Sequence, residues 1–271
     1  MKPAAFDYRA PRSIEEALSL LQAHAGQGAK LLAGGQSLVP VMNFRLAAPS
    51  LLIDLNRIPA LAGIRAEGDG ALRIGAMTRN RDIERSELVR TRNPLLHAAM
   101  PYIAHAQIRN RGTLGGSLAH ADPAAELPAV CVACEAELTI VGPHGERVVR
   151  AAEFFRGLFT TALEPDELLS EVRFPAWPAG RRFDFQEVSR RHGDFAIVGA
   201  AVLYDAPAAR VVVFGAEDAP RLFVLSGKTP AEAARAAAKE IAPRSDHHAR
   251  ADYRRELVEV LTRRALEKVM Q

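Results

Sequence analysis

Two diglycine segments contain the residues best suited to bind a ligand. The first, Ala33-Gly34-Gly35-Gln36-Ser37, follows a short apolar stretch, and the second, Gly112-Thr113-Leu114-Gly115-Gly116-Ser117, lies far along the chain. Adjacent glycines permit positive φ and let a ligand approach the backbone closely. Successive N–H groups in such a turn form an anion-binding nest, and a helix that begins at Ser37 strengthens it. For the first segment alone, a tight turn without a ligand is an equally good interpretation.

The second segment adds hydroxyl groups to the same backbone chemistry. Thr113 and Ser117 flank the glycine pair, and their hydroxyls can bond phosphate oxygens. Asp122-Pro123 predicts an N-cap with proline at the first helical position. A hydrogen bond to a charged group contributes about 1.5–3 kcal/mol, so four or five amides can hold a diphosphate without a dedicated lysine. We therefore predict that the two segments face each other around one diphosphate.

Other short patterns give weaker signals. No G-x-G-x-x-G follows a strand, and Gly227-Lys228-Thr229 lacks the P-loop glycine, since Leu222 stands in its place. Cys131 and Cys134 have C-x-x-C spacing, but they fall in an Ala-rich helix and cannot complete a four-ligand site, so we predict two buried small residues. His247-His248 fits either a metal ligand pair or solvated surface. We predict no metal site.

Composition limits the class of protein. The chain has 271 residues, of which 48% are apolar and 25% charged, as in ordinary globular proteins. A net charge of +3 is weak evidence for nucleic-acid binding, and we expect none. Two cysteines exclude a disulfide framework and an iron–sulfur cluster held by this chain alone. The N-terminus lacks a signal-peptide pattern and the apolar runs are too short for a membrane span, so we expect a soluble protein of the reducing cytoplasm.

The elements that must position the diglycine segments follow from periodicity. Ser13 and Glu16 predict a capped helix, and the stretches 30–33 and 51–55 predict a parallel pair of strands. Gly68-Asp69-Gly70 predicts a hairpin. Further expected elements are helices over 80–85, 94–104 and 123–134, strands over 138–141, 183–188, 196–204 and 210–213, and helices over 230–241 and 252–270. A linker-like composition near 175–180 predicts a domain boundary.

Several long stretches resemble one family. AGGQSLVPVMNFRLAAPSLLIDLNRI and IRNRGTLGGSLAHADPAAELPAV resemble the FAD-binding medium subunit of the molybdenum hydroxylases, which include xanthine dehydrogenase and aerobic carbon monoxide dehydrogenase. SRRHGDFAIVGAAV and ADYRRELVEVLTRRAL extend the resemblance over nearly the whole chain. It implies an α+β fold, with a vanillyl-alcohol-oxidase-type (PCMH-type) FAD-binding domain of two α/β subdomains and a small C-terminal α+β domain. The expected boundaries are 1–176, with subdomains of about 1–57 and 58–176, and 177–271.

The resemblance also implies which residues hold FAD. The residues expected to wrap the pyrophosphate, mainly by backbone amides, are Leu32, Ala33, Gly34, Gly35, Gln36, Ser37 and Leu38. The residues expected on the other side are Thr113, Gly115, Gly116 and Ser117, with His120, Asp122 and Glu126 lining the flavin and ADP parts and Leu168 making an apolar contact near the flavin. Many relatives carry lysine where Gln186-Glu187 stands here, which removes an expected cation near the reduced flavin. Arg190-Arg191 with Asp194 fits either a structural ion pair or a flavin contact.

The function implied by the resemblance is electron transfer. Such a subunit receives electrons from [2Fe–2S] clusters of a small subunit, while a large molybdopterin subunit oxidises the substrate, and the complex is expected to be a dimer of heterotrimers. We assign no catalytic acid, base or nucleophile to this chain, because the redox chemistry belongs to the cofactor. Two alternatives stay open: a self-sufficient FAD-dependent oxidoreductase of the same fold, and an interaction module that has lost its flavin.

Overall fold

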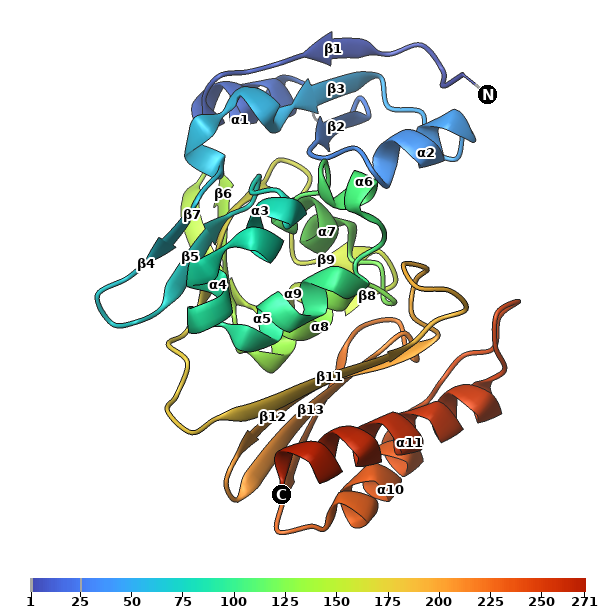
Figure 1. The fold of residues 1–271 in the computed structure, drawn as a ribbon. Helices are drawn as coiled ribbons and strands as arrows, with labels where there is room; N and C mark the ends of the chain where they lie inside the picture. Colours follow the sequence, from blue (N-terminus) through green and yellow to red (C-terminus); the bar gives the residue numbers. More distant parts are fainter. Residues whose placement is uncertain (1, 25) are drawn as a thin grey trace.

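The computed structural model describes residues 2–24 and 26–271, and its sheets are arranged one after another along the molecule (Figure 1). A small parallel sheet lies at the N-terminal end, a five-stranded antiparallel sheet with helices lies in the middle, and a four-stranded sheet with two helices lies at the C-terminal end. Within the described residues, no helix combines the length and the apolar character needed to cross a membrane.

The N-terminal sheet confirms the predicted parallel pairing. Its strands are in the order β1-β3-β2, with β3 parallel to both neighbours. The strands are β1 (Asp7–Arg9), β2 (Ala29–Leu32) and β3 (Leu51–Asp54), and the helices are α1 (Ile14–Ala23) and α2 (Leu38–Asn43). As predicted, the Ser13 hydroxyl accepts the Glu16 N–H at the start of α1. Because Leu32 pairs with Asp54, the residues that follow these two strands emerge at the same edge of the sheet.

The middle unit surrounds an antiparallel sheet in the order β4-β5-β10-β6-β7. Its strands are β4 (Ile64–Ala66), β5 (Leu72–Gly75), β6 (Glu137–Gly142), β7 (Gly145–Arg150) and β10 (Leu168–Phe174), with a small hairpin of β8 (Phe155–Gly157) and β9 (Thr160–Thr161). Its helices are α3 (Asn80–Arg85), α4 (Glu87–Arg92), α5 (Pro94–Ala99), α6 (Ala106–Arg109), α7 (Leu114–His120), α8 (Glu126–Ala133) and α9 (Ala151–Phe154). The short 3-10 helices are Leu55–Arg57, Pro59–Leu61 and Met100–Tyr102. The buried side chains of α8 belong to the largest core.

The C-terminal unit is an antiparallel meander covered by helices on one face. Its strands are β11 (Arg182–Val188), β12 (Val198–Asp205), β13 (Ala208–Phe214) and β14 (Arg221–Ser226), and its helices are α10 (Pro230–Glu240) and α11 (Ala251–Val269). Helix α11 packs on β11 and β12, while α5 and α8 of the middle unit also contact this sheet. In Figure 1 the sheet therefore lies between the middle unit and the two red helices. Strand β14 was not predicted, because only Phe223 and Leu225 of this edge strand are buried.

The structure corrects one local prediction and confirms another. The helix expected from Pro123 begins at Glu126 with Ala125 as its N-cap, so the assignment of Asp122 as N-cap is wrong. The Asp122 carboxylate instead accepts the N–H of Ala124 at 2.9 Å, an Asx turn that competes with helix initiation. The prediction for the cysteines is confirmed: Cys131 and Cys134 are both buried, and burial raises the pKa of the Cys134 thiol to about 12.

Candidate cofactor-binding site

The two diglycine segments contact each other. A Cβ added to Gly34 would lie 2.3 Å from the carbonyl oxygen of Arg111 and 2.8 Å from the Cα of Gly112. A Cβ added to Gly116 would lie 3.1 Å from the Cβ of Ala33. The two segments predicted to face each other around a diphosphate thus lie side by side, and their backbones meet at a distance that only glycine allows.

The first segment presents backbone N–H groups that the protein itself does not use. Between β2 and α2, the amides of Gly34, Gly35, Gln36, Ser37 and Leu38 donate to no acceptor within the described residues. Gly34 is buried and the other four are partly buried. Gly35 has φ +73°, and the side-chain amide of Gln36 donates to the Gly34 carbonyl at 2.9 Å, which fixes the turn. Because partly buried donors are normally paired, this run of amides is prepared for an anionic ligand.

The second segment is built differently. Thr113 is 2% exposed and caps α7, since its hydroxyl accepts the Gly116 N–H at 3.1 Å. The Gly115 N–H donates to the Ala76 carbonyl at 2.7 Å, and the Ser117 N–H donates to the Thr113 carbonyl at 3.1 Å. The expected nest of free amides is thus present in the first segment and absent from this part of the second. The second segment contributes close packing and the partly buried Ser117.

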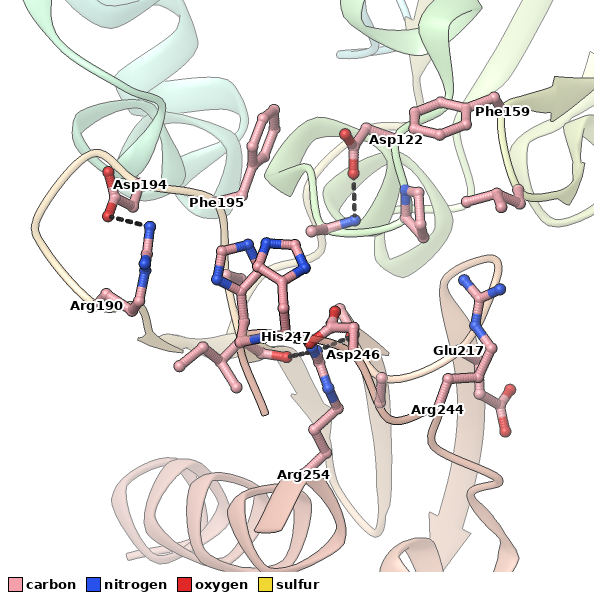
Figure 2. Close-up of a pocket in the computed structure, with 18 of the residues that line it drawn as sticks. Asp122, Phe159, Arg190, Asp194, Phe195, Glu217, Arg244, Asp246, His247 and Arg254 are labelled. Carbon is pink, nitrogen blue, oxygen red and sulfur yellow. Dashed lines mark hydrogen bonds and ion pairs between the residues drawn. The ribbon is translucent and has the colours of Figure 1, made fainter. Parts of the chain in front are cut away.

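Helix α7 connects the diglycine contact with a cavity of about 620 Å³ between the middle and C-terminal units (Figure 2). The residues of the middle unit that line it are Asp122, Pro123, Ala124, Leu158 and Phe159. Loops of the C-terminal unit complete it, among them the loop with Arg190 and Phe195 and the loop with His247 and His248. His120, the last residue of α7, stacks near Phe159 with ring centroids 5.1 Å apart. Burial lowers the pKa of His120 and so favours the neutral form of its ring, while the nearby Asp122 acts in the opposite direction.

One buried arginine holds the C-terminal wall of this cavity together. The Arg254 side chain is 5% exposed and donates to the carbonyls of Ile197 and Gly215, both at 2.6 Å. It also pairs with Asp246 at 2.6 Å, next to the histidine pair. Arg190 lies 3.8 Å from Asp194, a long exposed ion pair that leaves its guanidinium at the cavity. Of the residues the structure describes, no group of three or more His, Cys, Asp or Glu could hold a metal ion.

Comparison with known families fits this geometry. Residues 4–177 match the family described as FAD binding domain in molybdopterin dehydrogenase, and residues 223–269 match the CO dehydrogenase flavoprotein C-terminal domain. The chain belongs to this FAD-binding family. The predicted family and the predicted α+β fold class are both confirmed, and the cofactor that this domain binds is FAD.

Individual relatives match over their full length. The chain is 43% identical to the 6-hydroxypseudooxynicotine dehydrogenase complex subunit alpha of Paenarthrobacter nicotinovorans, covering 100% of this chain and 96% of the relative. A solved carbon monoxide dehydrogenase from Hydrogenophaga pseudoflava, which lacks the Mo-pyranopterin moiety of its cofactor, superimposes with TM-score 0.94 at 38% identity over 100% and 99% of the two chains. Quinoline 2-oxidoreductase from Pseudomonas putida 86 gives TM-score 0.93 at 37% identity over 99% and 98%.

The remaining predicted residues of this FAD-binding chain lie in different surroundings. Asp122 lines the cavity, whereas Glu126 is 4% exposed on the first turn of α8. Leu168 is fully buried at the start of β10, in the core shared with Leu61 and Met77. The predicted contact of Leu168 with the flavin stays a prediction.

Two neighbouring carboxylic acids, Glu126 and Glu187, have altered acidity. Burial, with the nearby Asp122 adding to it, raises the pKa of Glu126 to about 7. Burial and the charge of Glu126 raise the pKa of Glu187, on β11, to about 8. One oxygen of Glu187 is buried without a hydrogen-bond partner. Strand β11 therefore holds a carboxylic acid, Glu187, that is largely protonated at neutral pH.

Sequence reasoning missed Asn56 and Arg79, which together link the first diglycine segment to Arg111, the residue before the second segment. The Asn56 side-chain amide donates to the Ala33 carbonyl at 3.0 Å, and the Arg79 guanidinium donates to Asn56 and to the Arg111 carbonyl. The available signal was the parallel strand pair, because Asn56 follows β3 at the edge where Ala33 follows β2.

Proposed function

We propose that this chain is the FAD-carrying electron-transfer subunit of a molybdenum hydroxylase. It receives electrons from [2Fe–2S] clusters of a small partner subunit and delivers them to an external acceptor, while a large molybdopterin subunit oxidises the substrate. The observation that carries the proposal is the run of unused amides from Gly34 to Leu38, placed against the second diglycine segment. FAD, when bound, supplies the reversible one- and two-electron chemistry that such a relay requires.

The chain's own residues divide the binding of FAD between two places. The amides of residues 34–38 bind the pyrophosphate, and the Ser117 hydroxyl supports it from α7, with Ala33, Gly115 and Gly116 providing the close backbone packing. Thr113 acts through the α7 cap that it forms. Four or five charge-assisted hydrogen bonds of about 1.5–3 kcal/mol each are enough for tight binding of a dinucleotide.

The flavin ring belongs in the cavity at the other end of α7. A helix of this length spans about 10 Å, since each residue adds about 1.5 Å. The cavity walls combine apolar surface from Phe159 and Phe195 with polar groups such as Asp122, which suits a flat, amphipathic ring. His120 packs against Phe159, which lines the middle-unit side of this cavity.

We infer the partner subunits from the iron–sulfur ligands that the described chain does not supply and from the names of its relatives. Two buried cysteines cannot ligate an iron–sulfur cluster, so the clusters must come from another chain. The relatives are named as a dehydrogenase complex subunit and as a carbon monoxide dehydrogenase. We propose that the same division of labour, with a dimer of heterotrimers in the cytoplasm and a domain division near residue 176, holds for this chain.

Purification of the chain alone and together with its partner subunits tests the proposal. The chain alone should contain about one FAD per polypeptide and should not be reduced by small-molecule substrates. Addition of the iron–sulfur and molybdenum subunits should permit substrate-dependent bleaching of the flavin. Full activity of the isolated chain on a defined substrate would favour a self-sufficient oxidoreductase, and a colourless protein that rejects added FAD would favour an interaction module.

A further inference from the structure

We propose that Arg79 and Asn56 are positioning residues that hold the two diglycine segments together, and so preform the site for the FAD pyrophosphate. This inference rests on the proposed function, because it concerns the same site. Neither residue is in the predicted binding set, and neither needs to touch the cofactor to act.

The contacts form a continuous bridge from one segment to the other. The side-chain amide of Asn56 donates to the carbonyl of Ala33 in the first segment at 3.0 Å, and its side-chain oxygen Oδ1 accepts from the Arg79 guanidinium. A different nitrogen of the same guanidinium donates to the carbonyl of Arg111, beside the second segment. Arg111 is also the residue whose carbonyl lies against Gly34. The bridge therefore spans the point where the two backbones meet.

Both bridging residues are anchored to the elements that carry the segments. Arg79 pairs as an isolated β-bridge with Thr113, and the neighbouring Asn80 N–H donates to the Gly112 carbonyl at 2.9 Å. The Asn56 backbone N–H donates to the Asp54 carboxylate at 2.9 Å at the end of β3. Arg79 is thus part of the second segment's framework, and Asn56 is part of the first segment's framework.

The charges around Arg79 are mixed. Burial and the neighbouring Arg111 lower the pKa of Arg79, while the carboxylates of Asp82 and Asp54 act in the opposite direction. The nearby ion pairs in the described structure are Arg81–Asp82 and Arg109–Glu84, and they include neither Arg79 nor Arg111. A diphosphate bound to the adjacent amides would relieve the repulsion between these two arginines.

The bridge requires a guanidinium. Its two terminal nitrogens lie in a fixed fork and reach two acceptors at once, whereas a lysine ammonium is a single point. Arg79→Lys retains the charge and loses the bridge, while Arg79→Gln loses both. Asn56→Asp retains an acceptor for Arg79 and loses the donor to the Ala33 carbonyl, but it also adds a negative charge against Asp54, to which the Asn56 amide donates. Asn56→Ala removes the donor and the acceptor without adding a charge.

The experiment measures the dissociation constants of FAD and ADP for the full-length protein and these variants. Arg79→Gln and Arg79→Lys should each raise the dissociation constants of FAD and ADP by about tenfold. Within each variant the factor should be the same for the two ligands, because both carry the diphosphate. Asn56→Ala, which removes the contact with Ala33 without adding a charge, should weaken the binding of both ligands by a smaller factor. The visible spectrum of the remaining bound FAD should not change, since the flavin ring lies elsewhere. Arg85→Gln removes the same charge from the exposed last turn of α3 and serves as the matched control.

The outcomes separate this inference from the proposed function. Wild-type affinity in Arg79→Lys would overturn the bridge and leave a role for charge alone. Wild-type affinity in Arg79→Gln would overturn the inference and leave the FAD site intact. Failure of the wild-type protein to bind FAD or ADP would overturn both. If Arg79→Gln does not fold, the exposed Asn56 still tests the bridge, because unchanged ADP affinity in Asn56→Ala and Asn56→Asp would contradict it.

Discussion

The diglycine contact and the cavity lie at opposite ends of α7 and are built on opposite principles. At the contact, backbones meet because side chains are absent, and the ligand groups on offer are peptide N–H groups. At the cavity, side chains from several distant loops form the walls, and a buried arginine holds those loops together. The first region should be intolerant of any added atom, whereas the second should tolerate substitution and respond to changes of charge.

The largest expected effect comes from Gly34→Ala. The new Cβ would lie 2.3 Å from the Arg111 carbonyl oxygen, a backbone atom, so the two segments must separate. Overpacking of this kind destabilises the packed arrangement by about 1–3 kcal/mol. Because FAD binds only to that arrangement, we expect its dissociation constant to rise by about a hundredfold. Isothermal titration with FAD measures it. Gly68→Ala is the matched control, because no atom lies within 4 Å of its Cβ position; equal affinity in both variants would contradict the close contact.

Gly115→Ala sharpens the comparison within the first region. Its Cβ would lie 2.4 Å from the Cβ of Ala76, so the change strikes the packing of α7 and not the free amides. We expect a loss of about 2 kcal/mol in unfolding free energy, or a melting temperature lower by roughly 4–8 °C. Thermal unfolding of the protein without added FAD measures it. An unchanged melting temperature with lost FAD binding would place Gly115 at the ligand.

A third, smaller effect is expected at Gly35, where the backbone has φ +73°. Alanine in this left-handed conformation costs about 1 kcal/mol, whereas asparagine adopts it more easily. We expect Gly35→Ala to weaken FAD about fivefold and Gly35→Asn to weaken it less, as measured by FAD titration. The reverse order would show that space near Val39 and Leu32, and not backbone conformation, limits this position.

The two regions also differ in how far the sequence predicts them. The diglycine segments are local motifs, and the parallel strands 30–33 and 51–55 were recognisable from their apolar runs, so their meeting could be predicted. Which amides remain free depends on tertiary partners such as the Ala76 carbonyl, which no local pattern specifies. The cavity draws on loops near residues 122, 159, 195, 216 and 247, and their convergence follows only from the complete fold.

A local side-chain hydrogen bond that competes with helix initiation explains why the predicted start of α8 is wrong. Asp122-Pro123 carries a helix-start signal, yet the Asp122 carboxylate bonds the Ala124 N–H and the helix begins only at Glu126. As a result Glu126 enters the core on the first turn of α8, facing Glu187 of the C-terminal unit. This arrangement of acids could not be predicted from either segment alone.

The smallest effect is expected from Glu187→Gln, at an acid that neighbours Glu126 and is not among the residues lining the cavity. Burial raises the pKa of Glu187 from 4.5 to about 8, so the folded state retains a proton that the unfolded chain releases above pH 4.5. Stability is therefore lost as the pH rises from about 4.5 to about 8 and stays low above that range. Glutamine has no proton to lose, so Glu187→Gln should unfold at a higher temperature than the wild type at pH 9 and at the same temperature near pH 4.

Because the Glu187 side chain is partly accessible, we expect a difference in unfolding free energy on the order of 1 kcal/mol, or roughly 2–4 °C in melting temperature. Glu256→Gln on the exposed face of α11 controls for the loss of a surface charge. A difference in melting temperature between Glu187→Gln and the wild type that does not depend on pH would contradict the raised pKa of Glu187. The effect of the substitution would then come from packing and not from protonation.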